Sequence, residues 1–274
     1  MIRSAALSSA VDERATKHLL QNPGNEDLCF AIWHPSQGRV RITALVRDLV
    51  MPMEGDRFLH GNASFHVRYF ERALGAAVAA GGGLALMHSH VTPGWQGLSP
   101  DDERTEGEFA PAVAGATGLP FVGFTLGTNG AWSARFWERV GPRKYRPEWC
   151  ETVRVVGDRL AVTYHDAQRP RPEAQEELER TASAWGEDAQ GDIARLRCGV
   201  IGAGSVGSIV ACTMAKTGVM ALLTMDFDRM ERRNFDRQLL MKRRDGVVGE
   251  LKVDVLAREL PDVATSTDFD LQAL

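Results

Sequence analysis

The sequence predicts an α/β protein in two parts: a mixed α+β domain over residues 1–165, a linker at 166–175, and a partial Rossmann-like βαβ domain at 176–274. In the first part, short apolar strand patterns alternate with turn residues, which is typical of hairpins. Pro170 and Pro172 interrupt that pattern. Beyond them, the order helix, strand, glycine-rich turn, helix, strand indicates a βαβ unit.

The composition is that of a globular protein, with 44% hydrophobic and 25% charged residues among 274. A net charge of −4 gives no electrostatic indication of a nucleic-acid or membrane-surface partner. No apolar run approaches the roughly 18–20 residues that a membrane span needs. The N-terminal apolar stretch is too short for a signal peptide. The four cysteines are scattered, so we expect reduced thiols and a cytoplasmic protein.

Three hairpins are expected in the first domain, each joining two strand-like segments across turn residues: 28–34 with 39–46, 120–126 with 131–137, and 153–156 with 160–164. A helix is expected within 64–80, because apolar residues recur there at helical spacing and three glycines follow. A short buried strand at 84–87 leads directly into His88.

Two histidines and an aspartate form a candidate metal site. His88 and His90 stand at i and i+2 of an extended segment, so their imidazoles point to the same side. Ser99 has the chemistry of a helix N-cap, which places Asp102 in the first helical turn. Two imidazoles and one carboxylate leave a fourth position open, as at a catalytic zinc. Asp101 is the alternative carboxylate, and helix capping without any metal is the alternative role of Ser99 and Asp102.

The spacing His-x-His, eight residues, Ser-x-x-Asp resembles the signature of the JAMM (JAB/MPN) metalloproteases, with one residue more than usual before the serine. The resemblance implies that His88, His90 and Asp102 bind zinc. It also implies that Ser99 stabilises an oxyanion and that a glutamate near the first core strand takes a proton from zinc-bound water. Glu26 stands at that place, and its neighbour Asp27 would face the opposite side.

The second candidate site is a glycine-rich turn. Gly202, Gly204 and Gly207 form a G-x-G-x-x-G run between a strand and a helix, which indicates phosphate binding at a helix N-terminus. Asp226 ends the next strand, at about the distance of a ribose-binding carboxylate. Taken alone, this turn would suggest NAD(P) or FAD, or a plain Rossmann turn.

The residues after Asp226 resemble the D-x-D…N-x-x-R-Q run of the ThiF/MoeB and ubiquitin-activating adenylyltransferases. The resemblance implies that Asp226 binds the ribose of ATP and that Asn234, Arg237 and Lys252 contact its phosphates. It implies further that Arg180 reaches ATP across a homodimer interface. The chain stops at Leu274, before the family's magnesium-binding aspartate, so we expect ATP and magnesium to be used by a complete second domain.

A JAMM domain joined to an activating domain resembles bacterial ubiquitin-like conjugation systems. The two resemblances together predict a zinc-dependent isopeptidase that trims or removes a ubiquitin-like protein at its C-terminal tail, with a conjugating enzyme as a further partner. The alternative is an ATP-dependent adenylyltransferase that activates the C-terminus of a ubiquitin-like or sulfur-carrier protein, with the first domain as a binding module. A scaffold with two degenerate sites is the third possibility.

Overall fold

The computed structural model describes residues 1–173, 175–266 and 268–274. The chain divides into two compact units, Met1–Arg169 and Pro170–Leu274, and each is described by itself. The helices and strands of the first unit, in chain order, are β1 (Ile2–Ser8), α1 (Ser9–Leu19), β2 (Leu28–Gln37), β3 (Arg41–Val50), β4 (Arg57–His60), β5 (Asn62–Phe65), α2 (Val67–Ala79), β6 (Gly83–Ser89), α3 (Pro100–Thr117), β7 (Phe121–Leu126), β8 (Trp132–Gly141), β9 (Lys144–Trp149), β10 (Thr152–Val156) and β11 (Leu160–Tyr164).

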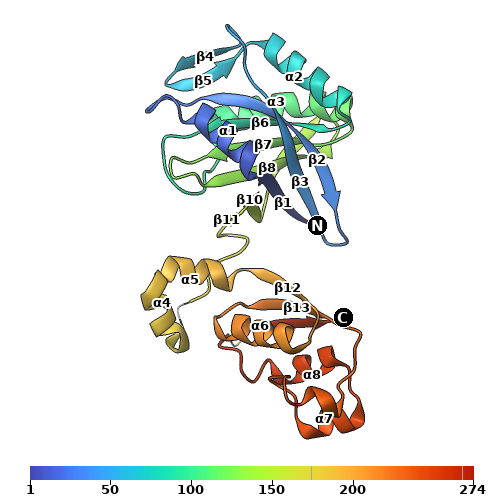
Figure 1. The fold of residues 1–274 in the computed structure, drawn as a ribbon. Helices are drawn as coiled ribbons and strands as arrows, with labels where there is room; N and C mark the ends of the chain where they lie inside the picture. The colour runs from blue at the N-terminus through green and yellow to red at the C-terminus, as the bar shows by residue number, and fades with distance from the viewer. Residues whose placement is uncertain (174, 267) are drawn as a thin grey trace. The chain divides into compact units, whose positions relative to one another are not determined.

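The first unit is built on a nine-stranded mixed sheet with the order β11-β10-β1-β3-β2-β6-β7-β8-β9 (Figure 1). Strand β2 pairs antiparallel with both β3 and β6, and β6 pairs parallel with β7. Because β6 and β7 are parallel, their connection must cross over the sheet, and α3 makes that crossover. The segment that follows β6 and the start of α3 therefore lie at the same end of the sheet.

Helices cover both faces of this sheet. Alternate residues of β2 belong to two different core clusters, Cys29, Ala31 and Trp33 to one, Phe30 and Ile32 to the other. The first cluster also contains the buried apolar residues of α1, and the second contains those of α2 and α3. Both faces of β2 are thus buried, which explains why its sequence is an apolar run and not an alternating one.

The three expected hairpins are confirmed as β2–β3, β7–β8 and β10–β11, all antiparallel. The expected buried strand is confirmed as β6, which is longer than predicted and includes His88 and Ser89. The helix expected within 64–80 begins only at Val67. Its first residues instead belong to β5, because Phe65 pairs with Arg57 in the β4–β5 hairpin.

The second unit is a βαβ arrangement with extra helices: η1 (Glu176–Leu178), α4 (Glu179–Trp185), α5 (Glu187–Ala194), β12 (Arg197–Ile201), α6 (Ser205–Lys216), β13 (Ala221–Met225), η2 (Arg232–Asn234), α7 (Arg243–Val248), α8 (Lys252–Glu259) and β14 (Asp270–Ala273). The sheet β12-β13-β14 is entirely parallel, as the predicted Rossmann-like pattern requires. The prediction of a βαβ element in this part of the chain is confirmed.

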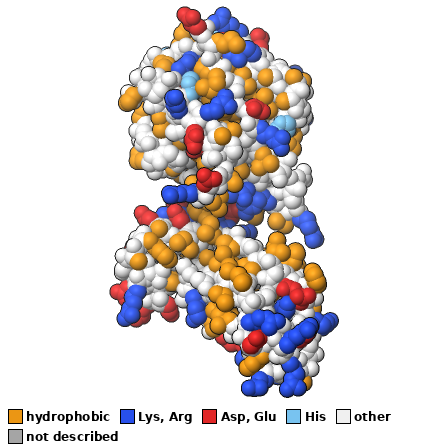
Figure 2. Space-filling view, viewed as in Figure 1, with side chains coloured by type: hydrophobic (Ala, Val, Ile, Leu, Met, Phe, Trp, Pro, Cys, Tyr) orange, Lys and Arg blue, Asp and Glu red, His pale blue; other side chains and the backbone are white. Residues whose placement is uncertain are grey.

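The second unit exposes large apolar side chains, and Figure 2 shows hydrophobic groups gathered on its visible face. Ile201, Val206 and Phe227 are 84%, 73% and 92% exposed. Ile201 directly precedes the glycine-rich turn, Val206 lies within it, and Phe227 directly follows Asp226. In neither unit is a helix of the described residues both long and apolar enough to cross a bilayer.

Replacement of Gly83 by alanine is expected to destabilise the first unit. A Cβ at Gly83 would overlap the indole of Trp33, which is fully buried. Overpacking of this kind costs about 1–3 kcal/mol. Gly75→Ala is the matched control, because a Cβ at this position of α2 would meet no atom within 4 Å and alanine is the better helix former. Urea unfolding should show the first variant less stable and the second at least as stable as wild type; equal midpoints for all three would contradict this packing.

Candidate functional site

The structure brings together the three predicted metal ligands at the end of β6 and the start of α3. The Nε2 atoms of His88 and His90 lie 3.2 Å apart. One carboxylate oxygen of Asp102 lies 3.4 Å from His88 Nε2, and the other lies 3.3 Å from His90 Nε2. One ligand atom from each residue falls within 4.8 Å of the other two. Two imidazoles and a carboxylate at this separation match the donor set of a zinc site.

Ser99 holds Asp102 in place through a capping box at the start of α3. The Ser99 Oγ accepts a hydrogen bond from the Asp102 backbone N–H at 3.1 Å, and both the N–H and Oγ–H of Ser99 donate to Asp102 Oδ2. The extra residue before Ser99 has not shifted the helix start. Asp101, the alternative ligand, is 63% exposed and pairs with Arg104, so it takes no part in the cluster.

The titratable groups of the cluster are strongly coupled. Burial acts to raise the pKa of the Asp102 carboxyl, but hydrogen bonds from the two histidines outweigh it and hold that pKa far below its ordinary value. The hydrogen bond with Asp102 raises the pKa of His90. Burial raises the pKa of Glu26, against the opposing effect of His90 and His88. Glu26 is therefore an ionisable neighbour of the cluster, on the loop before β2.

Asp27 has a structural role on the other side of that loop. Its buried carboxylate accepts hydrogen bonds from Arg57 at 2.6 and 3.0 Å and from Gln21 at 2.9 Å. The side chains of Glu26 and Asp27 thus have different surroundings, as expected for successive residues of an extended segment. Ser89, between the two histidines, donates to the Leu19 carbonyl and accepts from the Asp27 N–H.

Sequence reasoning missed Gln96, which orders the loop between His90 and Ser99. Its buried amide donates to the carbonyls of Thr92, Pro93 and Gly94 at 2.9–3.1 Å. The Gln96 Oε1 lies 3.3 Å from His90 Nδ1 and, as an acceptor, places the proton on that nitrogen. His90 Nε2 is then left with its lone pair toward the cluster, as a metal ligand requires. A single glutamine in a loop carries no local signal of this role.

In the second unit, the glycine-rich turn folds as predicted. Gly202 has φ +92°, a conformation that favours glycine. A Cβ at Gly207 would overlap the Gly202 carbonyl, so the first turn of α6 can pack this closely only with glycine. Gly204 is the N-cap of the 12-residue helix α6, whose first N–H groups face out of the turn. A helix N-terminus of this kind attracts phosphate.

Asp226 and Lys252 both lie at this turn. Asp226 accepts a hydrogen bond from the Ala203 N–H at 2.6 Å. Lys252 is buried, with 9% of its surface exposed. Its ammonium donates a hydrogen bond to the Asp228 carboxylate at 2.6 Å and lies 4.0 Å from the Asp226 carboxylate. Gln238, the last residue of the predicted N-x-x-R-Q run, had no role assigned to it from the sequence; its buried amide donates to the Ala203 carbonyl at 3.0 Å. It follows directly after Arg237 in the predicted N-x-x-R-Q run.

The other predicted nucleotide-binding residues make only local contacts. Asn234 accepts a hydrogen bond from the Glu231 N–H, and the exposed Arg237 pairs with Asp236. Arg180 lies on α4, which packs against η1 and α5. Among the contacts of the described residues, none joins Arg180 to the turn. Its predicted role requires a second copy of the chain.

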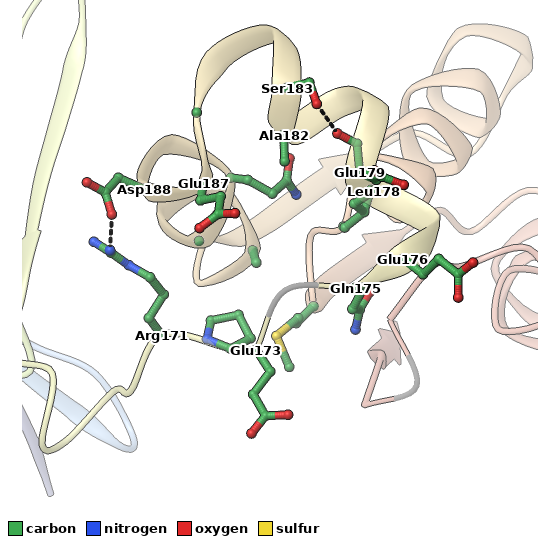
Figure 3. Close-up of a pocket in the computed structure, with 17 residues that line it drawn as sticks. Arg171, Glu173, Gln175, Glu176, Leu178, Glu179, Ala182, Ser183, Glu187 and Asp188 are labelled. Carbon is green, nitrogen blue, oxygen red and sulfur yellow. Dashed lines mark hydrogen bonds and ion pairs between the residues drawn. The ribbon is translucent and has the colours of Figure 1, made fainter.

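A cavity of about 750 Å³ lies in another part of the second unit, between α4, α5 and the segment before η1. Figure 3 shows Arg171 pointing to Asp188, with which it forms an ion pair, and acidic side chains such as Glu176 and Glu187 along the rim. Leu178 and Met220 also line the cavity. None of the predicted nucleotide-binding residues lines this cavity.

Comparison with known proteins bears on the second unit. Residues 178–271 match the ThiF family. No curated protein matches the chain. Among solved structures, the E. coli tRNA N6-threonylcarbamoyladenosine dehydratase TcdA is 28% identical over 40% of this chain and 42% of its own, with a TM-score of 0.33. E. coli MccB, solved with AMPCPP and MccA, is 22% identical over 36% of this chain and 30% of its own, with a TM-score of 0.34. The chain thus spans less than half the length of these proteins.

The ThiF match confirms the predicted family resemblance of the second part of the chain. It also overturns the main functional prediction. The chain was expected to be a zinc-dependent isopeptidase of the JAMM type, and this prediction is wrong: the family finding supports the alternative, an ATP-dependent adenylyltransferase, and the comparisons support no JAMM domain. The spacing of the two histidines, the serine and the aspartate did not suffice to predict the function.

Asp27→Asn is expected to destabilise the first unit in a pH-dependent way. Burial acts to raise the pKa of Asp27, but hydrogen bonds, that of Arg57 foremost, lower it overall. A carboxyl with a lowered folded pKa contributes stability above its unfolded pKa of about 3.9 and loses it as pH falls through the folded value. The variant should therefore lose about 2 kcal/mol of unfolding free energy near neutral pH, and less at about pH 3.

The matched control is Asp101→Asn, which changes an exposed aspartate of the same unit. Its unfolding free energy should stay within about 0.5 kcal/mol of wild type at both pH values. Denaturant titrations that show the same loss for Asp27→Asn at neutral and acidic pH would contradict the assigned charge state.

Proposed function

We propose that the second unit binds ATP at the glycine-rich turn and serves an ATP-dependent adenylyl transfer. The observation that carries this proposal is the ThiF family match over residues 178–271, which contains the turn and its partners. The geometry of the turn supports it, since Gly202 and Gly207 permit a tight approach of the backbone at the N-terminus of α6.

Each predicted residue has a place in this proposal. The N–H groups at the start of α6 donate hydrogen bonds to the phosphate oxygens, and the Asp226 carboxylate accepts hydrogen bonds from the ribose hydroxyls. The phosphates are contacted by two positively charged side chains, Lys252 and Arg237, and by the neutral amide donor of Asn234. Arg180 reaches the nucleotide of a second copy in a homodimer. Magnesium accompanies ATP in a complete domain, and supplies charge neutralisation to the phosphates when bound.

The reaction we propose forms a mixed anhydride. A carboxylate oxygen of the acceptor attacks the α-phosphorus of ATP, the bond to the β-phosphate oxygen breaks, and pyrophosphate leaves. Positive groups around the phosphates stabilise the charge that develops on the leaving oxygens. We propose the C-terminal carboxylate of a ubiquitin-like or sulfur-carrier protein as the acceptor, with the first unit as the module that binds it and a conjugating enzyme as a later partner.

Lys252→Met should weaken ATP binding. The substitution keeps the length of the stem and removes the ammonium, which lies between Asp228 and Asp226 at the turn. Loss of a charge-assisted contact to phosphate corresponds to about 10–100-fold in dissociation constant. Lys216→Met, at the exposed opposite end of α6, is the matched control and should bind as wild type does.

Titration calorimetry with ATP measures both variants. Equal affinities of wild type and Lys252→Met would contradict the role assigned to this lysine. Wild-type protein that binds no ATP would contradict the proposed function itself.

The histidine cluster supports a second candidate function, the binding of a divalent metal ion. We propose that His88, His90 and Asp102 hold zinc, and the observation that favours this is the convergence of their donor atoms within 4.8 Å. The cluster passes a chemical test of fit: with its Nδ1 proton donated to Gln96, His90 keeps the lone pair of Nε2, and an Asp102 carboxylate oxygen lies 3.3 Å from that atom. Bound zinc would supply Lewis acidity at this place.

Two flanking residues would assist that site. Ser99 fixes the Asp102 carboxylate through the capping box, and so sets the direction of its oxygens toward the histidines. Glu26 adds a second carboxyl that is electrostatically coupled to His88 and His90. We propose that Ser99 orients the Asp102 carboxylate as a metal ligand, and that the Glu26 carboxyl takes up and releases protons beside the metal site.

His88→Ala should abolish binding of zinc by the purified protein. Removal of one of three ligands typically leaves a site too weak to retain metal, while the buried position costs some stability. His60→Ala is the matched control, because His60 is exposed and lies outside the cluster. Metal analysis after dialysis should give about one zinc per chain for wild type and for the control, and almost none for His88→Ala. A wild-type value near zero would contradict the metal proposal.

A further inference from the structure

A buried ion pair lies beneath the histidine cluster. Glu106 on α3 and Arg135 on β8 have fully buried side chains, and the Arg135 Nε donates to Glu106 Oε2 at 2.9 Å while Nη2 donates to Oε1. A buried ion pair contributes little or nothing to stability unless its geometry is good and its other polar atoms are satisfied. Such pairs are retained for reasons of specificity in some proteins.

The surroundings of the pair are fitted to it. Trp137 donates from its indole N–H to Glu106 Oε2 at 2.6 Å. A Cβ at Gly123 would lie 2.6 Å from Arg135 Nε and would overlap the Glu106 carboxylate, so only glycine leaves the necessary space on β7. The Arg135 guanidinium lies 5.6 Å from the centre of the Trp149 ring. Three strands and one helix thus contribute to one enclosed polar group.

The pair is connected to the histidine cluster along two paths. Arg135 Nη1 donates to Thr125 Oγ1 at 2.6 Å, and that oxygen lies 3.4 Å from His88 Nε2. Along α3, Glu106 follows Asp102 by four residues, so both side chains lie on the same face of the helix, one turn apart. The same ion pair therefore limits the position of Asp102 through α3 and that of His88 through Thr125.

We propose that the Glu106–Arg135 pair is a positioning unit that sets the depth and rotation of α3 on the sheet so that Asp102 meets the two histidines. This inference rests on the proposed metal site and assigns it supporting residues. Among the described residues, the pair reaches the three proposed ligands only through Thr125 and along α3, so its effect is on ligand geometry and not on ligand identity.

The test compares cobalt binding by the full chain with and without the pair. The double variant Glu106→Leu with Arg135→Met replaces both charges by apolar side chains, a change that often leaves stability unaltered or improved. We expect a folded protein, by circular dichroism and thermal unfolding, whose affinity for Co²⁺ is about 10–100-fold lower than wild type. Its visible cobalt absorption should also change in shape, because a displaced carboxylate alters the coordination geometry.

The matched control removes another ion pair of the same unit. Arg3→Met with Glu138→Leu eliminates a partly exposed pair at 2.9 Å that makes no contact with the cluster among the described residues. Its cobalt affinity and spectrum should equal those of wild type. A folded double variant that binds cobalt as wild type does would overturn the positioning role.

Glu106→Gln provides a second test if the double variant fails to fold, because it keeps the shape of the side chain and an acceptor for Trp137. We expect about 10-fold weaker Co²⁺ binding with an altered spectrum, and unchanged binding would overturn the inference. Wild-type protein that binds no cobalt would instead refute the metal proposal, so the two failures are distinguishable.

Discussion

The Asp102 carboxylate makes two sets of contacts at once, one within the helix cap of α3 and one with the two histidines, and the arrangement of the first unit depends on both. It closes the capping box at the start of α3, where Ser99 donates to it through its backbone and its hydroxyl. The same carboxylate lies 3.4 Å from His88 Nε2 and 3.3 Å from His90 Nε2, one oxygen to each histidine. A shift of α3 along its axis would therefore disturb the helix terminus and the histidine cluster together. The first turn of this helix has little freedom to move.

This constraint follows from the topology of the sheet. Strands β6 and β7 are parallel, so the chain must cross one face of the sheet between them, and α3 is the crossover. The loop after His90 leads to the start of α3, and the buried Gln96 amide organises it through three backbone carbonyls. Further along α3, Glu106 fastens the helix to β8. The cluster is thus held from the loop, the helix terminus and the sheet.

Sequence patterns predicted the parts of this site that are local. The i, i+2 spacing of the histidines and the cap chemistry of Ser99 depend on neighbours within a few residues, and both predictions agree with the structure. Gln96 and the Glu106–Arg135 pair could not be predicted, because their roles arise from contacts between segments that are distant in the chain. The hairpins were likewise predictable, whereas β1, which pairs parallel with β3 and β10, has no such local signature.

Function was less predictable than geometry, since the same three ligands suit several activities. The family match over residues 178–271, and not the histidine cluster, is what favours the proposed class of reaction.

The glycine-rich turn illustrates why a local motif can still leave the chemistry incomplete. The Ala203 N–H already donates to Asp226, and the Gly202 N–H donates to the Met225 carbonyl. These two donors are therefore committed to the turn itself and make it rigid. The donors that remain for a phosphate are the first N–H groups of α6, which have no partner within the helix. Asp226 fixes the turn with one oxygen, and its carboxylate keeps further acceptor capacity for a ribose hydroxyl. In the proposed ATP site, the nucleotide would thus be recognised mainly by the N-terminus of α6, which the rest of the motif holds in place.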